Sequence, residues 1–147
     1  MKTKVFLIIS SLALLFAYSC SSEYIKINMS TPPFIIDSHV HYDATDEWEK
    51  SFLEIYSKHN AMACLLIPME DLERGIAFAK AHPDRVIPYA EIDIDSPTVT
   101  YDISMVYSMG FKGLGELFAR GRKDYSDPRY DTIWAMAEKL GMPVAPH

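Results

Sequence analysis

The feature that most constrains this chain is a unit that recurs at roughly 25 to 30 residues, a short apolar segment followed by an amphipathic one. Short apolar segments rich in β-branched residues predict buried strands, and apolar residues at steps of three and four predict helices. Strand and helix repeated in this order are typical of parallel β/α folds. The expected strands are 34–36 with its continuation to 42, 61–68, 86–90, 111–117 and 143–147, and the expected helices are 46–59, 70–81, 98–109 and 130–140.

Residues at the ends of these segments fit helix boundaries. Thr45 can cap the start of the first helix, and Asn60, Gly110 and Gly141 stand where a left-handed residue commonly ends one. The pattern gives about four βα units and the start of a fifth strand, and a complete (β/α)₈ barrel needs about 250 residues. We therefore expect an α/β protein that is either a small open sheet or the front part of a barrel.

The first residues have the character of a secretory signal. Lys2 and Lys4 precede an apolar run at 5–18, which is shorter than the 20 or so residues that a membrane-spanning helix needs. The segment 20–32 has turn formers and little apolar periodicity. We expect a signal peptide at 1–19, a tether at 20–32, and one domain at 33–147.

Cys20 directly follows Ala17, Tyr18 and Ser19. This stretch resembles the processing site of bacterial lipoproteins, which usually have Leu where Ala17 stands. The resemblance implies that Cys20 carries a lipid and that the exported protein is anchored to a membrane, facing the periplasm or the cell surface. Ordinary signal cleavage, which would give a secreted protein, is the alternative because Ala17 and Ser19 are small.

Charge excludes one class of partner. Removing Lys2 and Lys4 from the 14 basic residues leaves 12 against 20 acidic ones, a net charge of −8. A chain this acidic and without a basic tract is not expected to bind nucleic acid through its phosphates. With 49% hydrophobic residues it can bury a core, so disorder is excluded as well.

The segment Ile36–Tyr42 carries the first candidate for chemistry. Because side chains alternate along a strand, Asp37, His39 and His41 are expected on one side of it. Two imidazoles at this spacing can bind one ion with bonds of about 2.0–2.1 Å. Asp37 is expected to hold an imidazole N–H or to tie the strand end to a neighbouring loop.

Two further strand ends carry side chains of the same type. Glu116 ends the segment Gly110–Glu116, and a carboxylate there can bridge two ions or orient a metal-bound water in catalysis. His147 ends the last strand. If these strands are neighbours in one parallel sheet, both residues meet His39 and His41 at one rim. The sequence therefore predicts a divalent-metal site made by His39, His41, Glu116 and His147, with Glu116 also catalytic.

Other charged residues allow two interpretations. Arg120 and Arg122, in the loop after Glu116, would receive a substrate carboxylate or simply form an exposed basic loop. Lys112 is a candidate for a carbamylated metal bridge, although Glu116 is nearer the strand's end. The acidic residues after the third strand are expected to form a solvated loop, with a place at the rim as the alternative. They are Glu91, Asp93 and Asp95.

Three segments carry a resemblance to a known family. They are IDSHVHY at 36–42, GFKGLGE at 110–116, and 130–147, which ends in GMPVAPH. They resemble the first, fourth and fifth strands of the amidohydrolase superfamily, and most closely its amidohydrolase-related branch of hydrolases and metal-dependent decarboxylases. The resemblance covers roughly Pro33 to His147. Pro146 departs from it, and the family's later histidine and aspartate, on strands six and eight, have no counterpart in this sequence.

The resemblance implies a (β/α)₈ barrel around one or two divalent ions, usually zinc. It implies that His39 and His41 are ligands and that His147 is a further ligand or a substrate contact. The position of Glu116 is acidic in some branches only.

We therefore expect a metal-dependent hydrolase in which an ion of the zinc class lowers the pKa of bound water to about 7, so that the water attacks a C–N or C–O bond. The substrate would be a small molecule, with a carboxylic acid as one candidate. A decarboxylase of the same superfamily is an alternative. Another is a TatD-like phosphodiesterase, which usually continues Gly-Glu with Ile-Gly-Leu-Asp where this chain has Leu-Phe-Ala-Arg. The last is an inactive, lipid-anchored remnant or binding protein, since the chain holds only part of a barrel.

Overall fold

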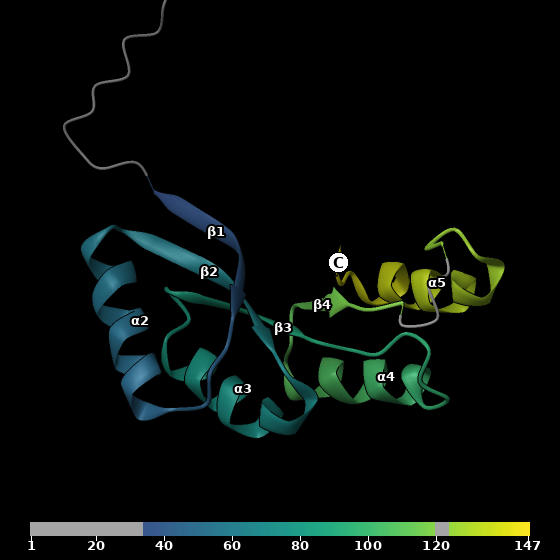
Figure 1. The fold of residues 1–147 in the computed structure, drawn as a ribbon, viewed down its shortest axis with the longest axis horizontal. Coiled ribbons are helices and arrows are strands. Elements are labelled where there is room, and N and C mark those ends of the chain that lie inside the picture. Colours follow the sequence, from purple (N-terminus) through teal and green to yellow (C-terminus); the bar gives the residue numbers. More distant parts are fainter. Residues whose placement is uncertain (1–33, 120–123) are drawn as a thin grey trace, which may run out of the picture. The chain divides into compact units, whose positions relative to one another are not determined.

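The strands and helices alternate along the chain in the expected order (Figure 1). The computed structural model describes residues 34–119 and 124–147. The expected signal peptide at 1–19, the tether at 20–32 with Cys20, and the loop residues Arg120 and Arg122 lie outside the described residues.

Five parallel strands form one sheet in the order β1-β2-β3-β4-β5. The sheet curls like half of a barrel, so the expected α/β class is confirmed. The strands are β1 (Ile35–His41), β2 (Ala61–Ile67), β3 (Val86–Ala90), β4 (Gly113–Leu117) and β5 (Val144–Pro146). The helices are α2 (Asp46–Lys58), α3 (Leu72–Ala81), α4 (Val99–Met109) and α5 (Asp131–Leu140), with 3₁₀ turns η1 (Met69–Asp71) and η2 (Pro128–Tyr130).

The predicted helix ends are confirmed. The Thr45 hydroxyl accepts a hydrogen bond from the backbone N–H of Trp48 at the start of α2. Asn60 follows α2 with a φ of 50°, and Gly110 and Gly141 end α4 and α5 in the left-handed region. Each end is therefore fixed by local chemistry that can be recognised in the sequence.

The main core lies between the sheet and its helices. Side chains of β2 alternate, so that Ala63, Leu65 and Ile67 join this core, where all three are fully buried. Burying a leucine or isoleucine side chain contributes about 1.5–3 kcal/mol. The helices add the large residues that complete the layer. They include Phe52, Ile76, Phe78, Ile103, Val106 and Ile133.

β1 does not keep the simple alternation that its sequence predicts. Asp37 pairs with Ala63 and Val40 with Leu65, so β1 has one more residue in this stretch than β2. This bulge places Asp37 on the helix side of the sheet, where its carboxylate accepts a hydrogen bond of 2.9 Å from the Tyr56 hydroxyl. The expectation that Asp37 shares a side with His39 and His41 is therefore wrong. Asp37 instead ties the strand to α2.

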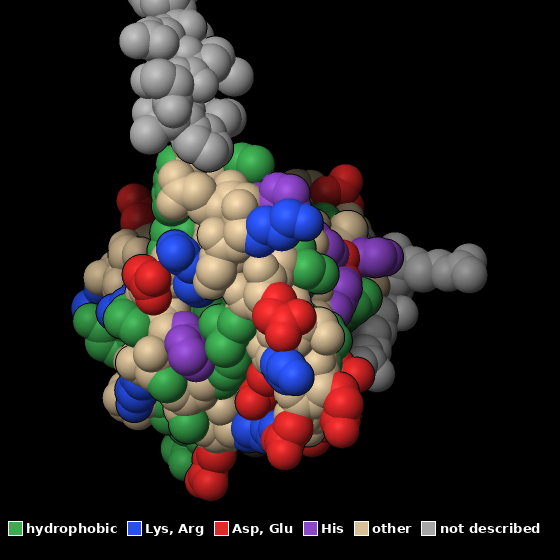
Figure 2. Space-filling model, turned by 90° about the vertical axis from the view of Figure 1, so that its left-hand side faces the viewer, with side chains coloured by type: hydrophobic (Ala, Val, Ile, Leu, Met, Phe, Trp, Pro, Cys, Tyr) green, Lys and Arg blue, Asp and Glu red, His purple; other side chains and the backbone are tan. Residues whose placement is uncertain are grey.

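The outer edge of the sheet at β1 is apolar and exposed. Phe34, Ile35 and Ile36 are about half exposed, and Ile55 of α2 is exposed as well. Figure 2, seen from the side of α2, shows hydrophobic side chains exposed between charged ones. Among the described helices, none is long and apolar enough to cross a bilayer.

Candidate metal centre

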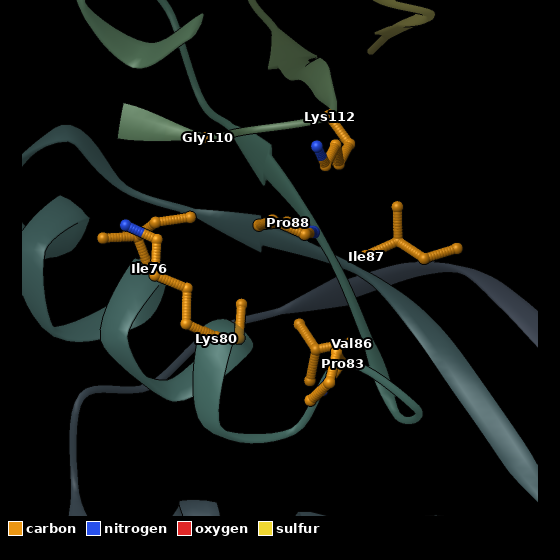
Figure 3. Close-up of a pocket in the computed structure, with 9 residues that line it drawn as sticks. Ile76, Lys80, Pro83, Val86, Ile87, Pro88, Gly110 and Lys112 are labelled. Atoms are coloured by element: carbon orange, nitrogen blue, oxygen red, sulfur yellow. The ribbon is translucent and has the colours of Figure 1, made fainter. Parts of the chain in front are cut away.

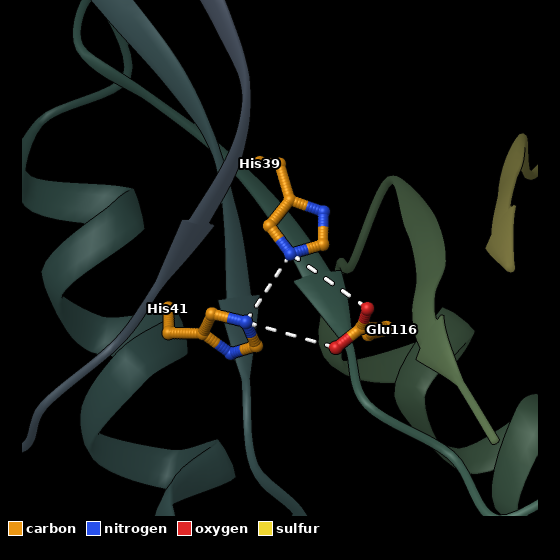
Figure 4. A group of neighbouring side chains, drawn as sticks. All are labelled: His39, His41 and Glu116. Carbon is orange, nitrogen blue, oxygen red and sulfur yellow. Dashed lines mark hydrogen bonds and ion pairs between the residues drawn. The ribbon is translucent and has the colours of Figure 1, made fainter. Parts of the chain in front are cut away.

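Three side chains from two strands converge at the carboxyl ends of the sheet (Figure 4). His39 and His41 come from the end of β1, and Glu116 comes from β4. The two Nε2 atoms are 3.2 Å apart. One Glu116 oxygen lies 3.8 Å from the His39 Nε2, and the other lies 3.6 Å from the His41 Nε2.

These separations match what one small cation requires. Ligand atoms about 2.0–2.1 Å from a tetrahedral ion lie about 3.3 Å from one another. The two Nε2 atoms are 3.2 Å apart, each lies 3.6–3.8 Å from a different Glu116 oxygen, and one ligand atom from each residue lies within 4.8 Å of the others, so small side-chain movements would bring them to that value. Two imidazoles and a carboxylate are also a donor set that suits zinc and neighbouring divalent metals. The residues therefore fit a divalent ion.

Glu116 is the centre of the group. Its residue is 5% exposed, and it is the only buried charged residue in the described part of the chain. Its ionic partners among the described residues are His39, His41 and His147. Because a buried carboxylate is costly unless a positive charge compensates it, the site favours a bound cation.

A second irregularity in the sheet presents Glu116. Gly115 pairs with Ala145 and Leu117 with Pro146, so Glu116 is an extra residue in β4. Gly115 has a φ of 156°, and a Cβ there would lie 2.7 Å from the Cβ of Ala145. Only glycine suits this position. Gly115 thus allows β5 to approach β4 closely beside Glu116.

His147 lies beside the group rather than within it. Its Nδ1 contacts Glu116, its backbone N–H donates to Leu117 across the β4–β5 pair, and its ring lies against Phe118. The ligand atoms that lie within 4.8 Å of one another belong to His39, His41 and Glu116. The structure thus brings all four predicted residues to one rim, and a ligand role for His147 stays a prediction.

Glu91 lies next to the site, although its sequence position predicted a solvated loop. Its carboxylate lies 3.0 Å from the Nδ1 of His41, and its side chain is 18% exposed. The solvated-loop interpretation is therefore wrong for Glu91. The available signal was its position directly after the third strand, the same position that pointed to His147 and Glu116.

The other two acidic residues of that loop have structural partners. Asp95 accepts a hydrogen bond of 2.8 Å from the Tyr130 hydroxyl. The Asp93 carboxylate accepts one from the backbone N–H of Asp95 at 3.0 Å. Both contacts stabilise the loop that leads to α4.

Lys112 lies at the opposite end of β4 from Glu116. It precedes the strand and lines a cavity of about 420 Å³ together with Lys80, Ile76 and Pro83 (Figure 3). This location agrees with the choice of Glu116 over a carbamylated Lys112.

The end of β1 is anchored by a buried tyrosine. Tyr42 follows His41 directly, and its hydroxyl donates to Glu49 of α2. Burial raises the pKa of Tyr42, and the neighbouring carboxylate adds to this effect. Arg74 of α3 donates to the same carboxylate at 2.9 Å and lowers the pKa of Glu49. The histidines therefore stand on a strand end that two helices hold in place.

No model of a protein family matches the chain, and comparisons with curated proteins and with solved structures found no match.

Proposed function

We propose that this chain is a metal-dependent hydrolase of the amidohydrolase-related kind and that its curled sheet is part of a (β/α)₈ barrel. The observation that carries the proposal is the convergence of His39, His41 and Glu116, whose ligand atoms lie within 4.8 Å of one another. Active sites of parallel β/α folds lie at the carboxyl ends of the strands, which is where these side chains are.

His39, His41 and Glu116 would hold the ion, and an ion of the zinc class suits them best. Once bound, it supplies Lewis acidity that lets water act as a nucleophile near neutral pH. The histidine side chains are 47% and 56% exposed, so a small molecule can approach from solvent. The buried Glu116 side chain lies on the side of the site away from solvent.

Glu116 supports hydrolysis as the reaction. Only one of its two oxygens is needed to hold the ion, so the other would be available to take a proton from attacking water. Decarboxylation does not need this proton acceptor. We therefore favour attack on a C–N or C–O bond.

The metal proposal can be tested on the full-length chain by titration with zinc against a competing chromophoric chelator. The native chain should bind zinc, and the double variant His39→Ala/His41→Ala should lose at least about tenfold in affinity. His59→Ala is the matched control, because His59 is an exposed histidine at the end of α2. A native chain that binds no zinc, or a double variant that binds it equally well, would contradict the proposal.

The reaction can be tested on the zinc-loaded chain with amides, esters, carboxylic acids and phosphodiesters. We expect hydrolysis of an amide or ester that disappears in the double variant and persists in His59→Ala. Release of CO₂ from an acid, or cleavage of a phosphodiester, would replace the hydrolase assignment.

A further inference from the structure

Glu91 reaches His41 from a different strand. It follows β3 directly, and its backbone N–H donates to the Ile67 carbonyl of β2 at 2.9 Å. The carboxylate is therefore presented by an ordered strand end. Its oxygen lies 3.0 Å from the Nδ1 of His41, on the side of the ring away from His39 and Glu116.

The two nitrogens of His41 face two different carboxylates. Glu91 lies 3.0 Å from Nδ1, and Glu116 lies 3.6 Å from Nε2. A neutral imidazole has only one N–H to donate. Because Glu91 is the nearer acceptor, the proton is favoured on Nδ1, which leaves the Nε2 lone pair facing His39 and Glu116. Without Glu91, the proton could move to Nε2 and donate to Glu116, and that nitrogen would no longer be a ligand.

His39 has no equivalent support. Among the described residues, no acceptor faces its Nδ1, and its backbone N–H donates to Asp37 at 3.2 Å. Among the described residues, carboxylate support at Nδ1 is therefore seen for His41 and not for His39.

We propose that Glu91 is a positioning residue that holds His41 in the tautomer whose Nε2 faces the group of His39 and Glu116. The use of this tautomer for metal binding rests on the proposed function, whereas the tautomer itself does not. Removing a carboxylate that orients a ligand histidine in this way commonly lowers metal affinity by about 10- to 100-fold.

The tautomer can be measured in the metal-free, full-length chain from the ¹⁵N shifts of the His41 ring. The native chain should carry its proton on Nδ1, and Glu91→Ala should move a substantial fraction to Nε2. Glu91→Gln preserves size and should fall between the two, and backbone amide spectra would show that both variants are folded. A native ring protonated on Nε2, or no change in either variant, would overturn the proposal.

Metal affinity is the second measurement, made with zinc alone as the probe. Glu91→Ala should weaken binding by about 10- to 100-fold. Glu70→Ala is the matched control, because Glu70 is an exposed acid that lines the same cavity of about 240 Å³ as Glu91. Glu70→Ala should change the zinc affinity less than about twofold, because solvent and salt screen the charge of an exposed side chain.

The two measurements separate the two ideas. If the native chain binds no zinc, the proposed function fails, and the ring ¹⁵N shifts still decide the role of Glu91. If zinc binds and Glu91→Ala binds it as tightly as Glu70→Ala does, the positioning role fails while the metal site stands.

Discussion

Replacing Glu116 with Gln should change the stability of the fold in opposite directions with and without zinc. The carboxylate is buried, and its ionic partners among the described residues are histidines, with no Lys or Arg. Gln keeps the size of the side chain and removes its charge. In the metal-free chain this change relieves a desolvated charge, so Glu116→Gln should be the more stable protein.

The expected change in the free energy of unfolding follows from the burial of Glu116. A buried polar group without full compensation costs about 1–3 kcal/mol, and more when it is charged. The neighbouring imidazoles offset part of this cost, so we expect a gain of about 1 kcal/mol, or about 4 °C in Tm for a domain of this size. Zinc at about a hundred times its Kd should stabilise the native chain by about 2.7 kcal/mol, or about 10 °C. The variant should gain little.

Thermal unfolding followed by circular dichroism, first with a chelator and then with zinc, would measure both effects. Glu138→Gln is the control, because Glu138 is an exposed glutamate on α5. The two melting curves should exchange their order when zinc is added. A variant less stable than the native chain in the chelator would show that Glu116 is a structural hydrogen-bond partner of the histidines, and the reasoning would fail.

Three further predictions concern the elements that carry the site. Burial, with the Asp37 hydrogen bond second, raises the pKa of Tyr56 to about 12. The folded state therefore favours the neutral phenol, and stability should fall as the pH rises between about 10 and 12; urea unfolding at alkaline pH should show a smaller loss in Tyr56→Phe, and an equal loss would contradict this cause. Gly113→Ala would place a Cβ 2.3 Å from the Tyr89 ring and should cost about 1–3 kcal/mol in urea unfolding; the double variant with Tyr89→Leu should recover most of it, and no recovery would refute the steric explanation. Thr45→Ala removes the cap of α2 and should cost about 1 kcal/mol, whereas Thr45→Ser should cost much less, and equal losses would exclude the hydroxyl as the cause.

Most of the architecture could be predicted because its signals are local. Apolar segments at strand spacing and left-handed residues such as Asn60, Gly110 and Gly141 mark where each element begins and ends. The convergence of Glu116 with the histidines of β1 followed only in part from the rule that parallel strands place their carboxyl ends at one edge; two strands separate β1 from β4, so the curl of the sheet is needed as well.

The side on which Asp37 lies could not be predicted, because a bulge depends on how two strands pair and not on the alternation within one of them. The contact between Glu91 and His41 likewise joins residues from strands that are not adjacent in the sheet. A single sequence contains the position of each residue but not this pairing.

The extra residue in β1 has a consequence for how such a site can change. The first half of the strand contacts α2 through Asp37, and the second half carries the histidines. Val40 and Tyr42, which alternate with the histidines, pack in or against the core, so a one-residue shift of this half would turn the imidazoles to the helix side and bring both residues out of the core. The placement of the imidazoles is therefore tied to the hydrophobic interior, and the extra residue lets Asp37 contact α2 without disturbing it.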